Sequence, residues 1–184
     1  VMTVLHAGGK FDHDSYKVSA GLHGVGVSAV NAVSEWRKME IWREGRVHMQ
    51  EYARGVPLAP LAAVGNTDKT GTRITFKPDP TIFAVHPGDV SDFNHEIIVA
   101  RLREIAYLNA GFIIEFRDER SEGRDHTFEY KGGIREFVEL LNKTKEPIHE
   151  PVIAIRVEQD KVDIEIALQW NGTYAEQIFC YTNN

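Results

Sequence analysis

The sequence contains a single cysteine, Cys180, and none of its hydrophobic runs is long enough to cross a membrane. One cysteine excludes an internal disulfide, and the apolar neighbours of Cys180 favour a buried, inert thiol over a nucleophile. A membrane-spanning helix needs about 20 mostly apolar residues. The sequence therefore predicts a cytoplasmic protein with no membrane partner.

An excess of basic charge is also missing. The chain has 27 acidic residues against 21 basic ones, for a formal net charge of −6 at pH 7. Because nucleic-acid-binding surfaces are usually basic, we expect any contact with DNA to lie outside this segment. The histidines form no i, i+4 pair around a carboxylate and have no cysteine pair beside them. We therefore expect surface histidines and no metal ligands.

The length of 184 residues allows one domain and part of another. Val1, Val4 and Leu5 have helical spacing but no capping residue before them. Residues 178–181 have the pattern of a strand, and only three residues follow. We therefore expect the chain to be a fragment, cut at both ends.

Hydrophobic periodicity predicts a mixed set of helices and strands. Helices are expected at 27–33, at 93–109 and after Gly132-Gly133. Strands are expected around Met39 and Ile41, around Val47 and Met49, and at 72–77. A hairpin is expected from 112–116 and 126–130, and three further strands from 152–181. The last region contains no helical pattern, which suggests the start of a new, strand-led domain.

Glycine is concentrated near the N-terminus, where five of the 15 glycines lie between residues 7 and 28. The segment 21–26 has the spacing Gly-x-x-Gly-x-Gly and leads directly into the expected helix. Such backbone can approach a ligand closely, and the amides of a helix N-terminus favour phosphate. The spacing fits neither a P-loop nor a dinucleotide-binding motif. On spacing alone, a phosphate cradle and a plain glycine-rich loop both remain open.

Three blocks, at residues 4–12, 15–19 and 21–28, together resemble the ATP lid of the DNA gyrase B subunits. The similarity continues through shorter matches along the chain, at 68–72, 101–104, 108–109, 117–118, 132–134 and 167–171. The resemblance implies an α+β fold, the two-layer α/β sandwich of the ATPases of gyrase, heat-shock chaperones, histidine kinases and MutL. It also implies an ATPase domain at 1–147 that lacks its N-terminal part, followed at 148–184 by the first strands of a transducer domain.

The resemblance also implies roles for individual residues. Main-chain amides would wrap the β- and γ-phosphates of ATP, with Gly21 allowing the turn; these amides belong to Leu22, His23, Gly24, Val25 and Gly26. His23 would act through its amide and not as a base. Lys10 would lie near the phosphates, Tyr16 would meet the nucleotide, and Thr72 would reach the adenine through ordered water. The alternatives are a solvated lysine, a packing tyrosine and an ordinary strand threonine. Arg43 matches an arginine at the mouth of the pocket.

The family's catalytic glutamate and its magnesium-binding asparagine precede the lid and are not among these residues. The expected cofactors are therefore ATP and Mg²⁺, with no catalytic residue and no metal ligand in this chain. Hydrolysis needs a positioned base and a metal, so we expect the 184 residues alone to be inactive. The implied partners of the intact enzyme are the gyrase A subunit and DNA, with homodimerisation driven by ATP.

Two other functions remain as alternatives, the B subunit of topoisomerase IV and an ATP-driven clamp of the chaperone or mismatch-repair type. The sequence also departs from the family pattern at three places. Ala20 replaces a glycine, and residues 84–92 form a longer loop than expected. Arg37 stands where an apolar strand residue is usual, so either the strand edge is exposed or the local packing differs.

Overall fold

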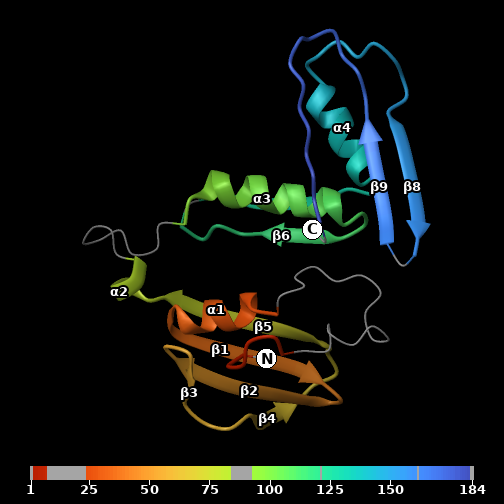
Figure 1. Ribbon diagram of the computed structural model, residues 1–184. Coiled ribbons are helices and arrows are strands. Elements are labelled where there is room, and N and C mark those ends of the chain that lie inside the picture. Colours follow the sequence, from red (N-terminus) through yellow and green to blue (C-terminus); the bar gives the residue numbers. More distant parts are fainter. Residues whose placement is uncertain (1, 8–23, 84–92, 121, 161, 183–184) are drawn as a thin grey trace. The chain divides into compact units, whose positions relative to one another are not determined.

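The computed structural model describes residues 2–7, 24–83, 93–120, 122–160 and 162–182. The chain divides into two compact units, Val1–Asp92 and Phe93–Thr182. Each unit combines helices with antiparallel strands (Figure 1), so the predicted α+β class is confirmed. Within these described ranges, no helix is both long and apolar enough to cross a membrane.

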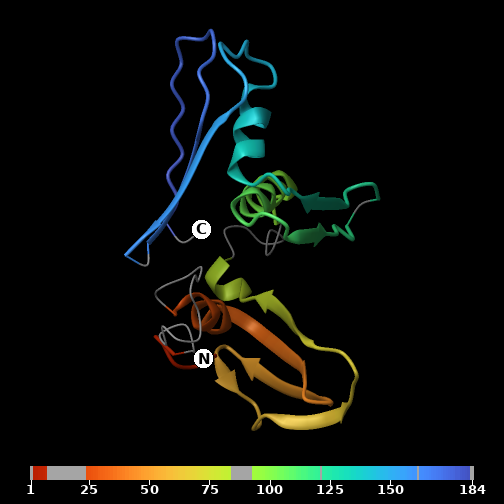
Figure 2. The ribbon, with the colours of Figure 1, turned by 90° about the vertical axis from the view of Figure 1, so that its right-hand side faces the viewer.

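The first unit is an antiparallel sheet with a short helix on one face (Figure 2). Its elements are α1 (Gly26–Ala32), β1 (Ser34–Arg43), β2 (Arg46–Ala53), β3 (Val56–Pro57), β4 (Ala62–Asn66), β5 (Gly71–Pro78) and α2 (Pro80–Phe83). The strand order is β3-β2-β1-β5, and β4 also pairs with β2. The predicted helix and the three predicted strands are confirmed as α1, β1, β2 and β5. The short elements β3, β4 and α2 were not predicted.

The register of the sheet makes β1 its central strand. Met39 lies opposite Gln50 of β2 on one side and opposite Ile74 of β5 on the other. A register shift between Ser34 and Trp36 interrupts the pairing with β5 at the start of β1. The helix α1 precedes this point directly, so β1 links the helix to the middle of the sheet.

The segment before the glycine cluster is a turn and not a helix. Within the described residues 2–7, the backbone forms only bends and turns, so the predicted N-terminal helix is wrong. The main-chain groups bond elsewhere: the Met2 carbonyl accepts a hydrogen bond from Asn31 Nδ2 at 3.1 Å, and the His6 amide donates to the Gly24 carbonyl at 3.2 Å. These bonds tie the segment to α1 and to Gly24, two residues before the helix.

Two turns of the sheet have the same backbone conformation. Glu44-Gly45 joins β1 to β2, and Arg54-Gly55 joins β2 to β3. All four residues have positive φ, as two-residue hairpin turns require. The first turn bonds to the end of β4, where the Gly45 carbonyl accepts a hydrogen bond from the Thr67 amide at 3.0 Å. The second turn lies against α1, because a Cβ atom added to Gly55 would lie 3.2 Å from Ala32 Cα. The second hairpin is therefore packed against the end of α1.

The second unit contains α3 (His95–Leu108), β6 (Ile113–Phe116), β7 (His126–Glu129), α4 (Ile134–Asn142), β8 (Ile153–Gln159) and β9 (Val162–Leu168). Asn94 caps α3 by accepting a hydrogen bond from the Ile97 amide at 3.1 Å. The strands β6 and β7 form the predicted hairpin, with Ile114 opposite Phe128. The helix α4 follows Gly133, whose φ of 59° suits glycine.

The core of this unit lies between α3 and the β6–β7 hairpin. Val99, Ala106 and Phe128 are buried there, and partly buried apolar side chains pack around them: Leu102, Ile114, Phe116 and Tyr130. Tyr107 stacks on Tyr130 with ring centroids 3.6 Å apart. Leu102 and Ala106 of the stripe predicted for 93–109 thus face the hairpin, whereas Ile97, which was also assigned to the stripe, is 68% exposed.

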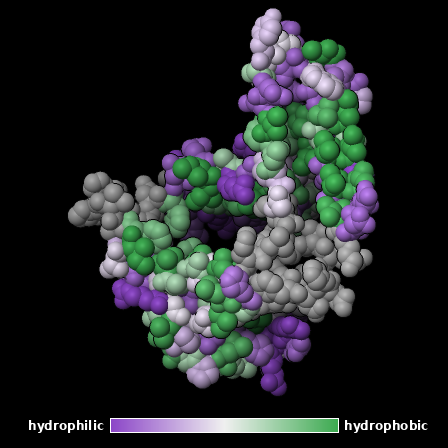
Figure 3. Space-filling view, viewed as in Figure 1, coloured by the Kyte–Doolittle hydropathy of each residue, from purple (hydrophilic) through white to green (hydrophobic). Residues whose placement is uncertain are grey.

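The strands β8 and β9 form a two-stranded antiparallel sheet. Alternate apolar residues of both strands share one face and are exposed, and Figure 3 shows hydrophobic surface over this hairpin; they are Ile153, Ile155, Val157, Val162, Ile164 and Ile166. The third strand predicted at 178–181 is wrong, because no strand pairing includes these residues. Cys180 is exposed, so the prediction of a buried thiol is also wrong.

Side-chain hydrogen bonds connect the end of α4 to the segment that follows β9. Asn142 Nδ2 donates to Gln169 Oε1 and Asn142 Oδ1 accepts from Asn171 Nδ2, both at 2.9 Å. Gln169 Nε2 in turn donates to the His149 carbonyl at 2.9 Å. The 167–171 block that carried part of the resemblance therefore has a structural role in this unit.

Candidate functional site

The end of the glycine-rich segment and the start of α1 are the described part of the expected phosphate site. Gly24 has a φ of 60°, and Val25 precedes the first helical residue with no side-chain cap. Gly24 and Val25 are half-buried, and Gly26 is exposed. A Cβ atom added to Gly26 would meet nothing within 4 Å. The backbone at the beginning of α1 is therefore open to a ligand.

The first amides of α1 have no acceptor among the described residues. The first bond of the helix runs from the Ala29 amide to the Val25 carbonyl at 2.8 Å. The hydroxyl of Ser28 donates to the same carbonyl at 2.9 Å. Within the described ranges, no hydrogen bond occupies the amides of Gly26, Val27 or Ser28. The described strands thus accept no hydrogen bond from this part of the backbone.

Arg37 lies under this helix and was not assigned a role from the sequence. It is 3% exposed, and its Nη1 donates to the Val27 carbonyl at 2.7 Å. Burial lowers the pKa of Arg37, and the nearby Tyr52 opposes that change. Because β1 is central in the sheet, the second alternative for this position is correct: the local packing differs and no strand edge is exposed. In the sequence, the only signal for this contact was an arginine at a position where the family usually has an apolar residue.

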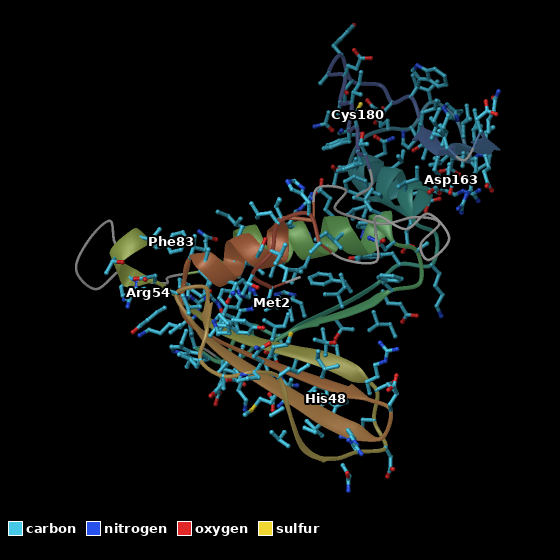
Figure 4. All side chains as sticks on the ribbon, turned by 60° about the horizontal axis from the view of Figure 1, so that its bottom comes forward. Met2, His48, Arg54, Phe83, Asp163 and Cys180 are labelled. Atoms are coloured by element: carbon cyan, nitrogen blue, oxygen red, sulfur yellow. The ribbon has the colours of Figure 1, made fainter. Side chains whose placement is uncertain are left out.

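Asn31 is a second buried residue that sequence reasoning missed. Its side chain is 1% exposed, and Nδ2 donates to the carbonyls of Met2 and Gly55, the latter at 3.2 Å. In Figure 4 the label of Met2 lies beside α1. The side-chain amide of Asn31 therefore joins residues 2–7 to the β2–β3 turn. Its position on a short helix gave no signal that separates it from an ordinary surface asparagine.

A charged cluster secures the other end of α1. The Asp79 amide donates to the Val33 carbonyl at 3.0 Å, just after the helix. The Asp79 carboxylate accepts from the hydroxyl and amide of Thr81 and from Arg54 Nε at 2.6 Å. These bonds, those from Thr81 first, lower the pKa of Asp79 from 3.8 to about 2. Figure 4 places Arg54 beside α2.

Thr72 and Arg43 lie on the same sheet, away from the start of α1 along the chain. Thr72 is exposed near the beginning of β5, opposite Ile41 of β1. Arg43 ends β1 with an exposed side chain, and its Nε donates to Glu44 Oε1 at 3.0 Å. No hydrogen bond between described residues joins either side chain to Gly24, Val25 or Gly26. The structure brings together only these last three predicted residues.

Several predicted residues lie outside the described part of the chain: Lys10, Tyr16, Gly21, Leu22 and His23. Ala20 and the loop at 84–92 also lie there. Their expected roles remain predictions.

The second unit contains a buried polar cluster around Asp118. Asp118 accepts hydrogen bonds from Arg120, and its Oδ2 lies 3.1 Å from His95 Nδ1. The bonds from Arg120 chiefly lower the pKa of Asp118 far below its usual range. His95 is 7% exposed, so the expectation of surface histidines is wrong for this residue. Across the described ranges, no three His, Cys, Asp or Glu side chains gather as a ready metal site.

Comparisons with known proteins agree with this architecture. The model of a family described as DNA gyrase B matches residues 133–184. The DNA gyrase B protein of Myxococcus xanthus is 50% identical over 184 residues, which is 100% of this chain and 22% of the relative. The DNA gyrase B protein of Thermotoga maritima is 47% identical over 190 residues, covering 100% of this chain and 29% of the relative.

A solved structure extends the match to the fold. It is the 43K ATPase domain of Thermus thermophilus gyrase B in complex with an aminocoumarin, with a TM-score of 0.72 and 41% sequence identity over 83% of this chain and 40% of that chain. The fold is therefore of the gyrase-type ATPase class. The chain spans between 22% and 29% of the length of the curated relatives reported above. It belongs to the DNA gyrase B family.

Proposed function

We propose that the chain is the ATP-binding part of a DNA gyrase B protein, and that ATP phosphates bind at the start of α1. The observation that carries this proposal is the open backbone at Gly26, where three successive amides have no acceptor among the described residues. A helix N-terminus attracts anions because its amides and its dipole both favour negative charge. The match to a gyrase B ATPase domain supports ATP as the phosphate source.

The site residues follow from the resemblance and this geometry. Gly24, Val25 and Gly26 offer main-chain groups at the start of α1, next to the cluster of buried bonds made by Asn31 and Arg37. The roles of Lys10, Tyr16, Gly21, Leu22, His23 and Thr72 are proposed from the resemblance alone. As the resemblance implies, we place the Mg²⁺ ligand outside these 184 residues.

The proposed function extends to the intact protein. With its A partner, the full-length protein would use ATP-driven dimerisation to pass one DNA duplex through another and introduce negative supercoils. Residues 1–147 would form part of the ATPase domain and residues 148–184 the start of the transducer. The exposed apolar face of the β8–β9 hairpin supports the start of a further domain in this region.

A charge change at Gly26 tests the phosphate site. Since the position is open, both glutamate and glutamine fit there, and they differ mainly in charge. We expect Gly26→Glu to weaken binding of a non-hydrolysable ATP analogue to the full-length protein at least about tenfold relative to Gly26→Gln, since a carboxylate repels the phosphates that the helix N-terminus attracts. Isothermal titration calorimetry measures the two affinities. Equal affinities would show that no phosphate lies at the start of α1.

Activity assays separate the alternatives. We expect the full-length protein with its A partner to supercoil relaxed plasmid in the presence of ATP. Decatenation and relaxation without supercoiling would instead identify a topoisomerase IV protein. ATP-dependent closure without DNA cleavage would identify a clamp of the chaperone or mismatch-repair type. The 184-residue chain alone is expected to hydrolyse no ATP, since a base and a metal ligand are both required.

A further inference from the structure

We propose that His95 and His126 form a binding site for a transition-metal dication such as Zn²⁺ or Ni²⁺. Their Nε2 atoms lie 3.2 Å apart, although the residues are 31 positions apart in the sequence. His95 begins α3 and His126 begins β7, so the helix and the hairpin present one imidazole each. The site lies in the second unit and is independent of the proposed ATP site.

The separation of the two nitrogens suits a tetrahedral ion. Zinc binds imidazole nitrogen at about 2.0–2.1 Å, so two histidines on one tetrahedral ion have their nitrogens about 3.3 Å apart. The rings are tilted by 47° with centroids 5.2 Å apart. A small rotation of each ring therefore directs both lone pairs at a shared ion. Water would complete the coordination, because two of the described residues supply ligands here.

The hydrogen bonds around His95 favour the required tautomer. His95 Nδ1 lies 3.1 Å from Asp118 Oδ2, and a carboxylate paired with arginines accepts hydrogen bonds but donates none. Nδ1 therefore carries the proton and Nε2 presents its lone pair. Metal-binding histidines are commonly oriented in this way by a carboxylate on the second nitrogen. Asp118 would act as a positioning residue and not as a ligand.

His126 can supply the second lone pair without losing a proton overall. Because His95 carries its proton on Nδ1, the 3.2 Å contact between the two Nε2 atoms assigns the Nε2–H of His126 as the donor in the metal-free pair. On metal binding the proton would move through water from Nε2 to Nδ1 of His126, so the ring stays neutral and one metal–nitrogen bond replaces the hydrogen bond. His126 also stacks on Phe128 with centroids 5.8 Å apart, which limits the orientations of the ring.

The surrounding charges select the class of ion. Both oxygens of Asp118 are engaged by Arg120 at 2.8 and 2.9 Å, and Arg124 Nη1 lies 3.7 Å from Oδ2. The donors that remain are imidazole nitrogens, which suit Zn²⁺, Cu²⁺ and Ni²⁺ and not Mg²⁺ or Ca²⁺. The aromatic ring of Phe116, 5.4 Å from His95, adds no oxygen ligand. The site would therefore discriminate against the Mg²⁺ that accompanies ATP.

A count of bound Zn²⁺ on the full-length protein tests the proposal. After removal of metals with a chelator, calorimetric titration should give one fewer tight Zn²⁺ equivalent for His95→Gln and for His126→Gln than for the parent. His48→Gln, on β2 of the other unit, is the matched control and should leave the count unchanged. Electron paramagnetic resonance of Cu²⁺ should lose a two-nitrogen signal in the same two variants.

Loss of the Zn²⁺ site can be distinguished from misfolding of the variants and from an error in the proposed ATP site. His126 is only partly buried, so its variant should keep the parent's far-ultraviolet circular dichroism even if the His95 variant does not. Asp118→Asn should keep the two-nitrogen signal and bind Zn²⁺ about 10- to 100-fold more weakly. An unchanged Zn²⁺ count in a folded His126→Gln protein would overturn the proposal. Binding of the ATP analogue is expected to be the same in parent and His126→Gln.

Discussion

The two units are stabilised in different ways. In the first unit the buried side chains are mostly polar, and they bond to main-chain groups: Asn31, Ser34, Arg37 and Asp79. In the second unit apolar side chains of α3 and the β6–β7 hairpin form a cluster around Ala106 and Phe128. The polar side chains of the first unit hold turns and loops near the start of α1, where the candidate phosphate site lies. The apolar cluster of the second unit stabilises its fold mainly through the hydrophobic effect. Substitutions should therefore have different effects in the two units.

The largest effect is expected in the apolar cluster. Phe128→Ala removes a ring that is 3% exposed, and loss of such a buried ring costs about 3–5 kcal/mol in the free energy of unfolding. Hydrogen exchange measured on peptides of the second unit reports this change. The control is Phe112→Ala, at a side chain that is 61% exposed. Equal effects for the two variants would mean that the cluster is not the centre of this unit.

A smaller effect is expected from the polar anchor of the first unit. Asn31→Ala leaves the carbonyls of Met2 and Gly55 without this donor, and an unsatisfied buried group costs about 1–3 kcal/mol. Exchange should rise in peptides containing residues 2–7 and the β2–β3 turn, while the second unit stays unchanged. Asn66→Ala, on the exposed strand β4, serves as the control. If protection from hydrogen exchange in residues 2–7 is the same in Asn31→Ala and in the parent, Asn31 does not anchor this segment.

The smallest effect is expected from the charged cluster near the end of α1. Because the folded pKa of Asp79 is about 2, below its ordinary 3.8, ionised Asp79 stabilises the fold above about pH 4. That contribution is lost as the pH falls through about 2. Asp79→Asn should therefore lower the unfolding temperature at about pH 6, and the gap to the parent should narrow between about pH 4 and pH 2. A constant gap across this range would show that the ionised form is not stabilising.

The regular elements could be predicted from the sequence because their packing follows simple periodicity. The alternation of Met39 and Ile41 indicated β1, and the stripe through Ile98, Leu102 and Ile105 indicated α3 within two residues at its start. The resemblance identified the family, which residue spacing alone left undecided. The expected sandwich fold then followed from the family.

The errors arose where tertiary contacts decide the outcome. The spacing of Val4 and Leu5 suggested a helix, but Asn31 takes the Met2 carbonyl as an acceptor. The apolar run at 178–181 suggested a strand, yet Tyr181 bonds through its hydroxyl to Glu104, 77 residues away. Burial and this bond raise the pKa of Tyr181 to about 12. Such long-range partners are invisible to a local pattern.

The candidate site was predictable only in part for the same reason. The glycine spacing located the start of α1, since backbone amides at a helix N-terminus follow from local sequence. The contact of Arg37 with Val27 could not be predicted, because it depends on how β1 lies under the helix. The His95–His126 pair joins two elements whose register a single sequence does not specify.

The two glycine turns of the first sheet have different consequences for engineering. A Cβ atom added to Gly45 would meet nothing within 4 Å, so a peptide inserted at this turn would have room provided that the bond from the Thr67 amide to the Gly45 carbonyl is kept. Arg54-Gly55 also has positive φ at both residues, but a Cβ atom added to Gly55 would lie 3.2 Å from Ala32 Cα, so the end of the helix would have to shift slightly. A turn with space for an insertion and a turn packed against a helix are thus separated by a single strand, β2.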